Sequence, residues 1–570
     1  MKWKNLVDRL PGLPDDPSHI AHVTLRTYSL ALSLSLGPSL LPFVLSRVAP
    51  RSTGSTKYNG RALLKVLRRE LGHDGFAFAM TLAIAGGEAL NRYFSAEAYA
   101  EVPAESNPTA EPRPTFHSLL ARLSAAQRTF VANLVSSAIS ILLIQAGRDR
   151  SLRLRNNPPS MDAIPLTVSI PHSSRSGVAV PSPTLDLTLL LLVRAIDSLC
   201  QSFVFTRCNN ASEKSTQPTK IPDETDDVQE EEKQLRRRRL GLTTRIDALV
   251  FWACGARIMW CFFYRPERLP RAYVKWISSL AAVDPRLPKA LRAIRTGRWS
   301  YIHCSPKESH LLTSLSQDLG YPPAWGDPSA LPAFGGPAAN VTWAEMGVHN
   351  RSGIGGIPCE LVHGGITSRF GLDGSCTANA AVRGAYAFAE AMAIYLPVHL
   401  LPVVLGRPSS LLQPHKAISV LLGAARSATF LSTFVSSYYF TVCVTRTLAF
   451  ARLFPSVSHD FWDGPYGCIM AACLTCGSSI WIENGRRRGE MALYVLPRAI
   501  RTLLPNSWLR GNRPLARGLE RLVFVLSFAT LITGAMHKPH SLRGLSKWTA
   551  AFILKGPRAG FGKTGDQISN

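Results

Sequence analysis

Cys359, His363 and Cys376 lie in a stretch that is dense in glycine and proline. Their spacing, Cys-x3-His-x12-Cys, offers two thiols and an imidazole, and Cys304 or His303 would complete a set of four donors. Zinc in structural sites is held by four such donors in a tetrahedron. Two alternatives stay open: a disulfide between cysteines, and a polar loop that docks at a membrane face. The pattern makes these three residues candidate metal ligands and does not by itself decide among the three possibilities.

Two other patterns suggest chemistry but have simpler explanations. Cys473-x2-Cys476 has the spacing of a redox or zinc half-site, but it lies among small apolar residues, which favours helix packing. Gly560–Thr564 resembles the end of a phosphate-binding loop, but Pro557 stands where the first glycine is required. No nucleophile–base pair or paired carboxylates stand out. We therefore expect no catalytic activity and no cofactor.

Charged residues inside apolar segments are costly in a membrane and usually functional. Arg194 and Arg498 occupy corresponding places in two similar segments, Asp197 lies three residues after Arg194, and Glu390 interrupts a third apolar segment. These four side chains would either line an intramembrane polar path or pair to hold helices together.

Long uncharged segments indicate that parts of the chain are surrounded by lipid. A helix needs about 20 apolar residues to cross the roughly 30 Å of hydrocarbon in a bilayer. Several shorter or charge-interrupted segments, among them Ala248–Tyr264 and Leu522–Met536, add further candidates. We expect about nine or ten helices, of which about eight span the membrane. The four windows of sufficient length without a charge are Tyr28–Ser46, Thr129–Gly147, Ser427–Thr445 and Gly464–Ile482.

The chain carries a net charge of +26, with 64 basic and 38 acidic residues. Such an excess would suggest nucleic-acid binding if it were gathered on one surface. Instead, lysine and arginine cluster at the edges of apolar segments, as in Arg486–Arg488, which is typical of membrane proteins. The expected partner is therefore a lipid bilayer, with membrane proteins or further copies of the chain as additional partners, and not nucleic acid.

Similar segments recur in the same order in both halves of the chain. Arg26–Arg47, with Leu40-Leu41-Pro42, is matched by Arg383–Arg407, with Leu400-Leu401-Pro402, and three later pairs follow in order. Repeated halves are common in membrane bundles. The predicted fold is an all-α, polytopic integral membrane helix bundle built from two homologous halves. Its expected parts are a polar segment 1–26, a first repeat 27–303 with a disordered insert 209–239, a Gly/Pro-rich linker 304–373, a second repeat 374–556 and a tail 557–570.

The second half carries a more specific signature. Trp481–Tyr494 contains Ile-Glu-Asn-Gly-Arg-Arg-Arg, with Glu483, Arg486 and Arg487, after an apolar segment. Together with Cys359, His363 and Cys376, this turn resembles the transmembrane protein 135 family over about Pro358–Gly556. The resemblance implies a multi-pass membrane protein of peroxisomes or mitochondria, associated with organelle dynamics and lipid handling, and it brings no catalytic residues. The alternatives are a transporter or channel with a polar path between the repeats, and a membrane-embedded lipid enzyme.

Overall fold

The chain is helical throughout the part that the structure describes. This computed structural model describes residues 18–48, 75–100, 122–153, 184–215, 225–303, 310–348, 351–372, 374–406, 413–505 and 514–556, with a few isolated residues between them. Every regular element in these ranges is a helix, so the predicted all-α class is confirmed. The chain divides into two packed units. Unit 1 combines residues 1–221 with 504–570, and unit 2 is residues 222–503.

Unit 1 is a bundle whose closing helix comes from the end of the sequence. Helix α4 packs on α2 and α6, and α21 packs on α6 and α7. The α4–α6 contact is close because the Ser136 and Ser140 hydroxyls of α6 donate to the Ala83 and Ala79 carbonyls of α4, both at 2.8 Å. Small residues allow this approach. The helices are α2 (Ile20–Val48), α4 (Phe76–Ala100), α6 (Ala125–Arg153), α7 (Leu185–Ser215), α21 (Pro514–His537) and α22 (Gly544–Lys555).

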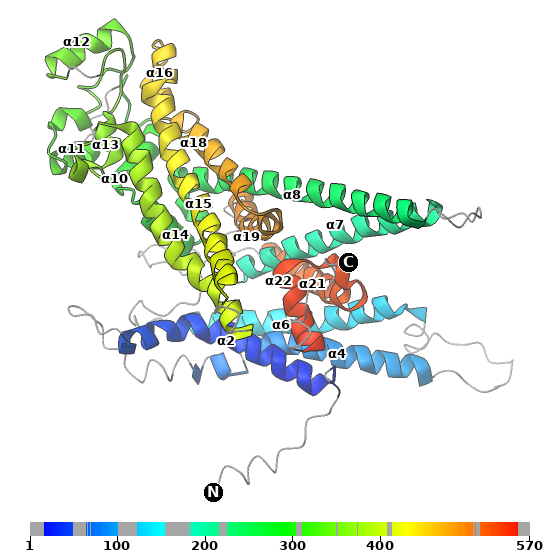
Figure 1. The fold of residues 1–570 in the computed structure, drawn as a ribbon. Coiled ribbons are helices and arrows are strands. Elements are labelled where there is room, and N and C mark those ends of the chain that lie inside the picture. The colour runs from blue at the N-terminus through cyan, green and yellow to red at the C-terminus, as the bar shows by residue number, and fades with distance from the viewer. Residues whose placement is uncertain are drawn as a thin grey trace. The chain divides into compact units, whose positions relative to one another are not determined.

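Unit 2 contains the long helices that position the candidate site. In Figure 1, α14 and α15 run side by side, and the short helices α11 and α13 lie near the end where α15 leads into α16. Helix α8 packs against α18 and α19. The long helices are α8 (Thr225–Tyr264), α14 (Cys376–Gly406), α15 (Pro414–Cys443) and α19 (Gly485–Leu503). The shorter helices include α16 (Phe450–Leu453), α17 (His459–Trp462), α18 (Cys468–Cys476) and the 3-10 helix η6 (Gly477–Ile482).

The stretch predicted to be a linker, 304–373, belongs to a folded region with its own core. Trp299, Leu312, Trp343 and Leu361 are buried against one another there. Aromatic burial explains why a segment rich in glycine and proline folds. Its helices are α10 (Arg286–Arg295), α11 (His310–Asp318), η2 (Pro323–Gly326), α12 (Pro337–Glu345) and α13 (Cys359–His363). The preceding helix, α9 (Arg271–Ala281), packs its Ile277 into the core of the long helices instead.

The predicted insert 209–239 also differs from expectation. Helix α7 continues to Ser215 and helix α8 begins at Thr225, so both flanks of the insert are helical. Glutamate, glutamine, lysine and arginine, which occupy all of 229–239 except Leu235, have high helix propensity, and polarity alone does not disfavour a helix. The tail 557–570 and residues 1–15 of the N-terminal segment lie outside the described residues.

Four helices are long and apolar enough to cross a membrane within the described ranges. Two contain the predicted windows 129–147 and 427–445, whereas the window 464–482 forms only the shorter helical stretch Cys468–Ile482. The expected number of about eight spans is therefore not reached among these residues. The chain is a membrane protein by the length and composition of these helices, which are Ala125–Gly147, Gly241–Tyr264, Pro414–Leu453 and Pro514–His537.

The packing pattern bears on the predicted duplication. If α2, α4, α6, α7 and α21 are matched in turn to α14, α15, α18, α19 and α8, the same four helix pairs pack in both units. The units do not coincide with the predicted repeats 27–303 and 374–556, because each takes its fifth helix from the other half of the sequence. The matching favours a duplication in which the last helices are exchanged; the duplication itself stays a prediction.

A substitution at Gly477 tests whether η6 and α8 approach each other closely. A β-carbon at Gly477 would lie 2.5 Å from Cδ1 and 3.2 Å from the backbone Cα of Trp252, whereas one at Gly518 of α21 would meet nothing within 4 Å. We expect Gly477→Ala to lower the free energy of unfolding by about 1–3 kcal/mol, because overpacking forces the backbone to move. Gly518→Ala is the matched control and should be neutral or slightly stabilising. Denaturant titration in detergent measures both, and equal effects would contradict the close contact.

Candidate metal centre

Four buried side chains from three helices meet at one point in unit 2. Cys359 and His363 lie one turn apart on α13, Cys376 is the first residue of α14, and Cys443 is the last residue of α15. Their ligand atoms all lie within 4.8 Å of one another, with 3.5 Å between Cys443 Sγ and His363 Nε2. A tetrahedral zinc with ordinary bond lengths needs separations of about 3.6 Å for S···N and about 3.8 Å for S···S. The four donors therefore suit a Cys₃His zinc site.

The fourth donor differs from the one expected. His303 is exposed, and Cys304 lies outside the described residues, while Cys443 joins the three predicted ligands. Cys443 lies inside an uncharged window, where a thiol is interpreted as a small apolar side chain. One signal was present. Cys443 is three residues from Arg446, at the end of the window, where a thiol can reach a segment outside the membrane.

The surroundings of Cys359 favour the thiolate that binds metal. Hydrogen bonds from the thiols of Cys376 and Cys443, supported by the positive charges of Arg446 and Arg351, hold the pKa of Cys359 well below its usual range despite burial. The Cys359 Sγ also lies 2.9 Å from the Thr447 hydroxyl. All nine cysteines in the described ranges are free thiols, so the cluster contains no disulfide.

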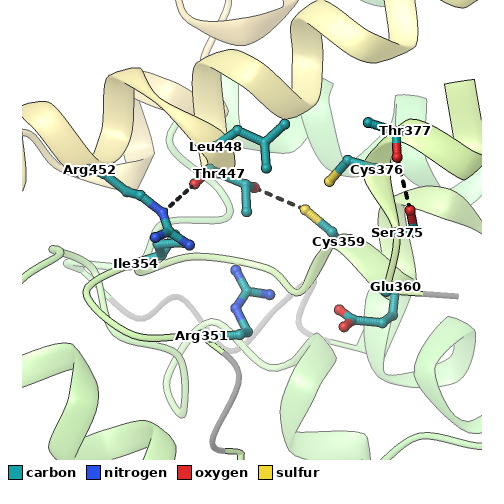
Figure 2. Close-up of a pocket in the computed structure, with 11 residues that line it drawn as sticks. Arg351, Ile354, Cys359, Glu360, Ser375, Cys376, Thr377, Thr447, Leu448 and Arg452 are labelled. Carbon is teal, nitrogen blue, oxygen red and sulfur yellow. Dashed lines mark hydrogen bonds between the residues drawn. The ribbon is translucent and has the colours of Figure 1, made fainter. Parts of the chain in front are cut away.

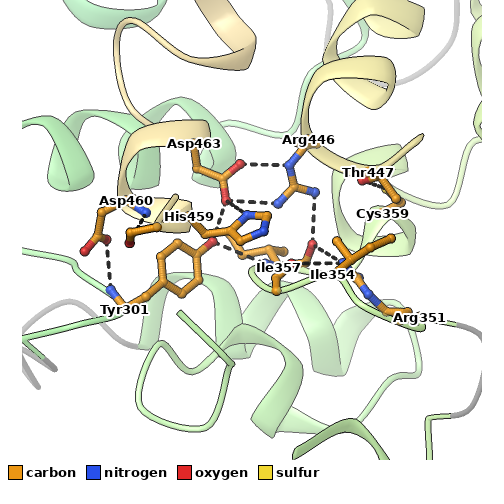
Figure 3. Close-up of polar contacts among 12 residues, drawn as sticks. Tyr301, Arg351, Ile354, Ile357, Cys359, Arg446, Thr447, His459, Asp460 and Asp463 are labelled. Atoms are coloured by element: carbon orange, nitrogen blue, oxygen red, sulfur yellow. Dashed lines mark hydrogen bonds and ion pairs between the residues drawn. The ribbon is translucent and has the colours of Figure 1, made fainter. Parts of the chain in front are cut away.

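A buried ion pair between Arg446 and Asp463 lies beside the segment that carries Cys359, as Figure 3 shows. Arg446 lies in η5 (Val444–Leu448), a π-helix that continues α15. Its Nε and Nη2 donate to the Asp463 carboxylate at 2.8 and 3.0 Å, and its Nη1 donates to the Ile357 carbonyl at 2.9 Å. Ile357 is two residues before Cys359, and Arg446 is three residues after Cys443. The guanidinium of Arg446 therefore links the two segments that carry these cysteines.

Asp463 collects further contacts that hold it in the charged form. Tyr301 donates its hydroxyl proton to Asp463 at 2.6 Å and accepts the Ile357 N–H at 3.2 Å. Burial acts to raise the pKa of Asp463, but the charge of Arg446 outweighs it and holds that pKa below its usual range. The Nδ1 of His459 lies 3.9 Å from Asp463, too far for a hydrogen bond, and burial lowers the pKa of His459.

The predicted polar-path residues are divided between the units. Arg194 and Asp197 lie on α7 of unit 1, and the Asp197 carboxylate pairs with Arg543 at 2.6 Å. Glu390 is exposed on α14 of unit 2, and the Arg498 guanidinium carbon lies 3.8 Å from the Tyr494 ring centroid. Neither unit alone brings the four together, and a path between the repeats stays a prediction.

The turn that carries the family resemblance forms a buried polar cluster. Glu483 is buried and accepts hydrogen bonds from the Ser427 hydroxyl of α15 and, at 3.2 Å, from the Asn484 N–H. Arg487 donates to the same Ser427 hydroxyl at 2.7 Å and contacts His399 Nε2 of α14 at 2.6 Å. Arg486 is exposed. Glu483 and Arg487 thus tie the start of α19 to α14 and α15.

Comparisons of the chain with protein-family models, curated proteins and solved structures give no match. The fold and the site define a helical membrane protein with a buried Cys₃His cluster at the ends of two long helices. Function must therefore be argued from this geometry and from the motifs in the sequence.

The buried ion pair predicts a large stability effect at Asp463. We expect Asp463→Asn to lower the free energy of unfolding by about 3–5 kcal/mol, because it leaves the Arg446 charge buried without its partner. Since the folded pKa of Asp463 lies below its unfolded value of about 3.9, this contribution should be complete above about pH 5 and shrink only as pH falls below about 4.

The matched control is Asp318→Asn, because Asp318 pairs with Arg286 at 2.6 Å but is largely exposed. This substitution should cost less than about 1 kcal/mol. Denaturant titrations in detergent at several pH values compare the two variants with the parent chain. A difference between parent and Asp463→Asn that disappears already between pH 7 and pH 5 would contradict the assignment.

Proposed function

We propose that the chain is a non-enzymatic, multi-pass organellar membrane protein whose second unit is stabilised by a structural zinc ion. The observation that carries the proposal is the convergence of Cys359, His363, Cys376 and Cys443 from α13, α14 and α15. Four protein donors would fill a tetrahedral zinc and leave no position for a substrate or an activated water. The ion would therefore hold structure together and not catalyse a reaction.

Zinc at this point would join a membrane-length helix to a folded region outside the membrane-length helices. Helix α15 belongs to a segment long and apolar enough to span a membrane, whereas α13 belongs to the region with the buried tryptophan core. A single ion bound by both fixes the folded region to the ends of α14 and α15. Metal binding of this kind contributes directly to folding free energy.

The cellular part of the proposal rests on the motif around Glu483, Arg486 and Arg487. Its resemblance to the transmembrane protein 135 family supports a role in mitochondrial or peroxisomal dynamics and lipid handling, exerted through the bilayer and membrane-protein partners. Within unit 2 the motif residues bind α14 and α15, which suits a structural contribution to a membrane bundle.

Metal analysis tests the zinc centre directly. The full chain purified in detergent should contain about one zinc, and Cys443→Ala and Cys359→Ala should each reduce the content to near zero and lower the melting temperature. Cys476→Ala is the matched control, since Cys476 is equally buried but lies in α18 outside the cluster. Elemental analysis and thermal unfolding provide the readouts. Full zinc retention in Cys443→Ala, or an oxidised pair among these cysteines, would refute the centre.

Membrane integration and organelle are tested together in cells. After extraction with alkaline carbonate we expect the tagged chain to stay in the membrane pellet, because its apolar helices are surrounded by lipid. Fluorescence imaging should place it with peroxisomal or mitochondrial markers. A chain that is soluble without detergent would contradict the membrane assignment, and exclusive overlap with another compartment would contradict the organelle assignment.

A further inference from the structure

A cavity of about 310 Å³ opens beside the cysteine cluster in unit 2. Figure 2 shows its walls: the loop that carries Arg351, Ser375 with the first two residues of α14, and the end of η5 with Arg452 of α16. Cys359 and Cys376 line one side. Neither the zinc centre nor the ion pair accounts for the polar groups at the other walls.

Arg351 is a buried cation with unused hydrogen-bond donors. Only 5% of its surface is exposed, and its guanidinium carbon lies 4.7 Å from the Trp343 ring centroid. One nitrogen, Nη2, donates to the carbonyls of Gly355 and Ile357 at 3.4 and 3.2 Å, while Nε and Nη1 have no hydrogen-bond partner. Buried donors without acceptors are costly, so they indicate that a ligand supplies the acceptors.

The opposite wall is suited to the same kind of ligand. The first turn of α14 lines this side of the cavity. Helix α14 has 31 residues, and its amino end carries partial positive charge. The hydroxyls of Ser375 and Thr377 lie there, 3.1 Å apart. Arg452 adds a second, exposed guanidinium, which donates its Nε proton to the Thr447 carbonyl at 3.0 Å. Arginine and helix amino ends both favour phosphate oxygens.

Glu360 is the cavity's one carboxylate, and its Oε2 has no hydrogen-bond partner. This carboxylate would repel a ligand that carries only negatively charged groups. It would, however, accept a hydrogen bond from a donor group that lies next to a phosphate. We propose that the cavity binds the phosphate group of a membrane lipid whose headgroup carries an amine, with Arg351, Arg452 and the first turn of α14 around the phosphate and Glu360 facing the amine.

The surroundings of the cavity favour a lipid over a soluble phosphate compound. Helix α16, which ends the membrane-length segment Pro414–Leu453, exposes Phe450 and Leu453, the latter with 69% of its surface accessible. Leu448, which lines the cavity, is also exposed, as are Phe370 and Leu372 just before α14. Exposed apolar side chains at the end of a membrane-length helix lie where headgroups meet acyl chains.

Arg351 has a second role, since its charge also stabilises the Cys359 thiolate. The test therefore relies on Arg452 and Thr377, which lie outside the cluster and the ion pair. The inference goes beyond the proposed function and does not need zinc to be bound. Zinc content, measured on each variant, separates a failure of the lipid site from a failure of the metal centre.

The experiment measures lipid binding by the full chain in detergent with native mass spectrometry. The probes are phosphatidylethanolamine and a diacylglycerol with the same acyl chains but no phosphate. We expect the phospholipid to bind and the diacylglycerol not to bind. Arg452→Gln and Thr377→Val should each weaken binding by roughly tenfold through a lost hydrogen bond to phosphate, with unchanged zinc content. Arg369→Gln, which removes an exposed arginine outside the cavity, is the control and should bind as the parent does.

Competition distinguishes the source of the phosphate. Glycerophosphoethanolamine and inorganic phosphate should displace the phospholipid only at far higher concentration, because they lack the acyl chains. Displacement at equal concentration would overturn the lipid assignment and identify a soluble phosphate ligand. Equal binding of diacylglycerol and phospholipid, or phospholipid binding by Arg452→Gln and Thr377→Val as tight as by the control, would overturn the phosphate site.

Discussion

The buried pair of Arg446 and Asp463 is the constraint on which the second unit depends. Both side chains are almost completely removed from solvent, so each needs the other and enough hydrogen-bond partners to offset lost hydration. Asp463 meets this need with Tyr301, and Arg446 with the Ile357 carbonyl. These contacts join the end of a membrane-length helix to a loop that is distant in sequence. The cysteine cluster and the cavity lined by Arg351 both lie where this junction brings the segments together.

Close packing of small residues provides the complementary constraint in the long helices. The Ser432 hydroxyl of α15 donates to the Gly384 carbonyl of α14 at 2.8 Å, and a β-carbon at Gly384 would lie 3.1 Å from Cβ of Ser436. In unit 1, a β-carbon at Gly87 would lie 2.3 Å from Asn133 Oδ1. Helices surrounded by lipid gain little from burying apolar side chains against each other, so close van der Waals contact and interhelical hydrogen bonds take over. The contacts at Gly384 hold α14 and α15 together along the two helices that carry Cys376 and Cys443.

Sequence patterns predicted the elements better than the site. Uncharged windows bounded by arginine marked α6 and α15, and the spacing of Cys359, His363 and Cys376 indicated three of the four clustered side chains. Cys443 was missed because a thiol inside an uncharged window resembles a packing side chain, and its place three residues before Arg446 is only a weak signal. The buried core around Trp299 and Trp343 was missed for a related reason, since glycine and proline suggest a linker until aromatic burial is known. Both features depend on tertiary contacts between segments that are distant in the sequence. The periodicity of apolar residues along the sequence contains no information about such contacts.

The place of α21 in unit 1 has a consequence for biosynthesis. Unit 1 includes Phe524 and Phe528 of α21 in its core beside Ile84 and Ile141, yet α21 follows the whole of unit 2 in the chain. A ribosome must therefore complete nearly the entire polypeptide before the first bundle receives its closing helix. Until then, Gln145 of α6 and Thr184, the residue before α7, stay without their later partners Arg521 and Glu520. Insertion machinery that shelters unfinished helices, rather than stepwise folding of each half, matches this order of assembly.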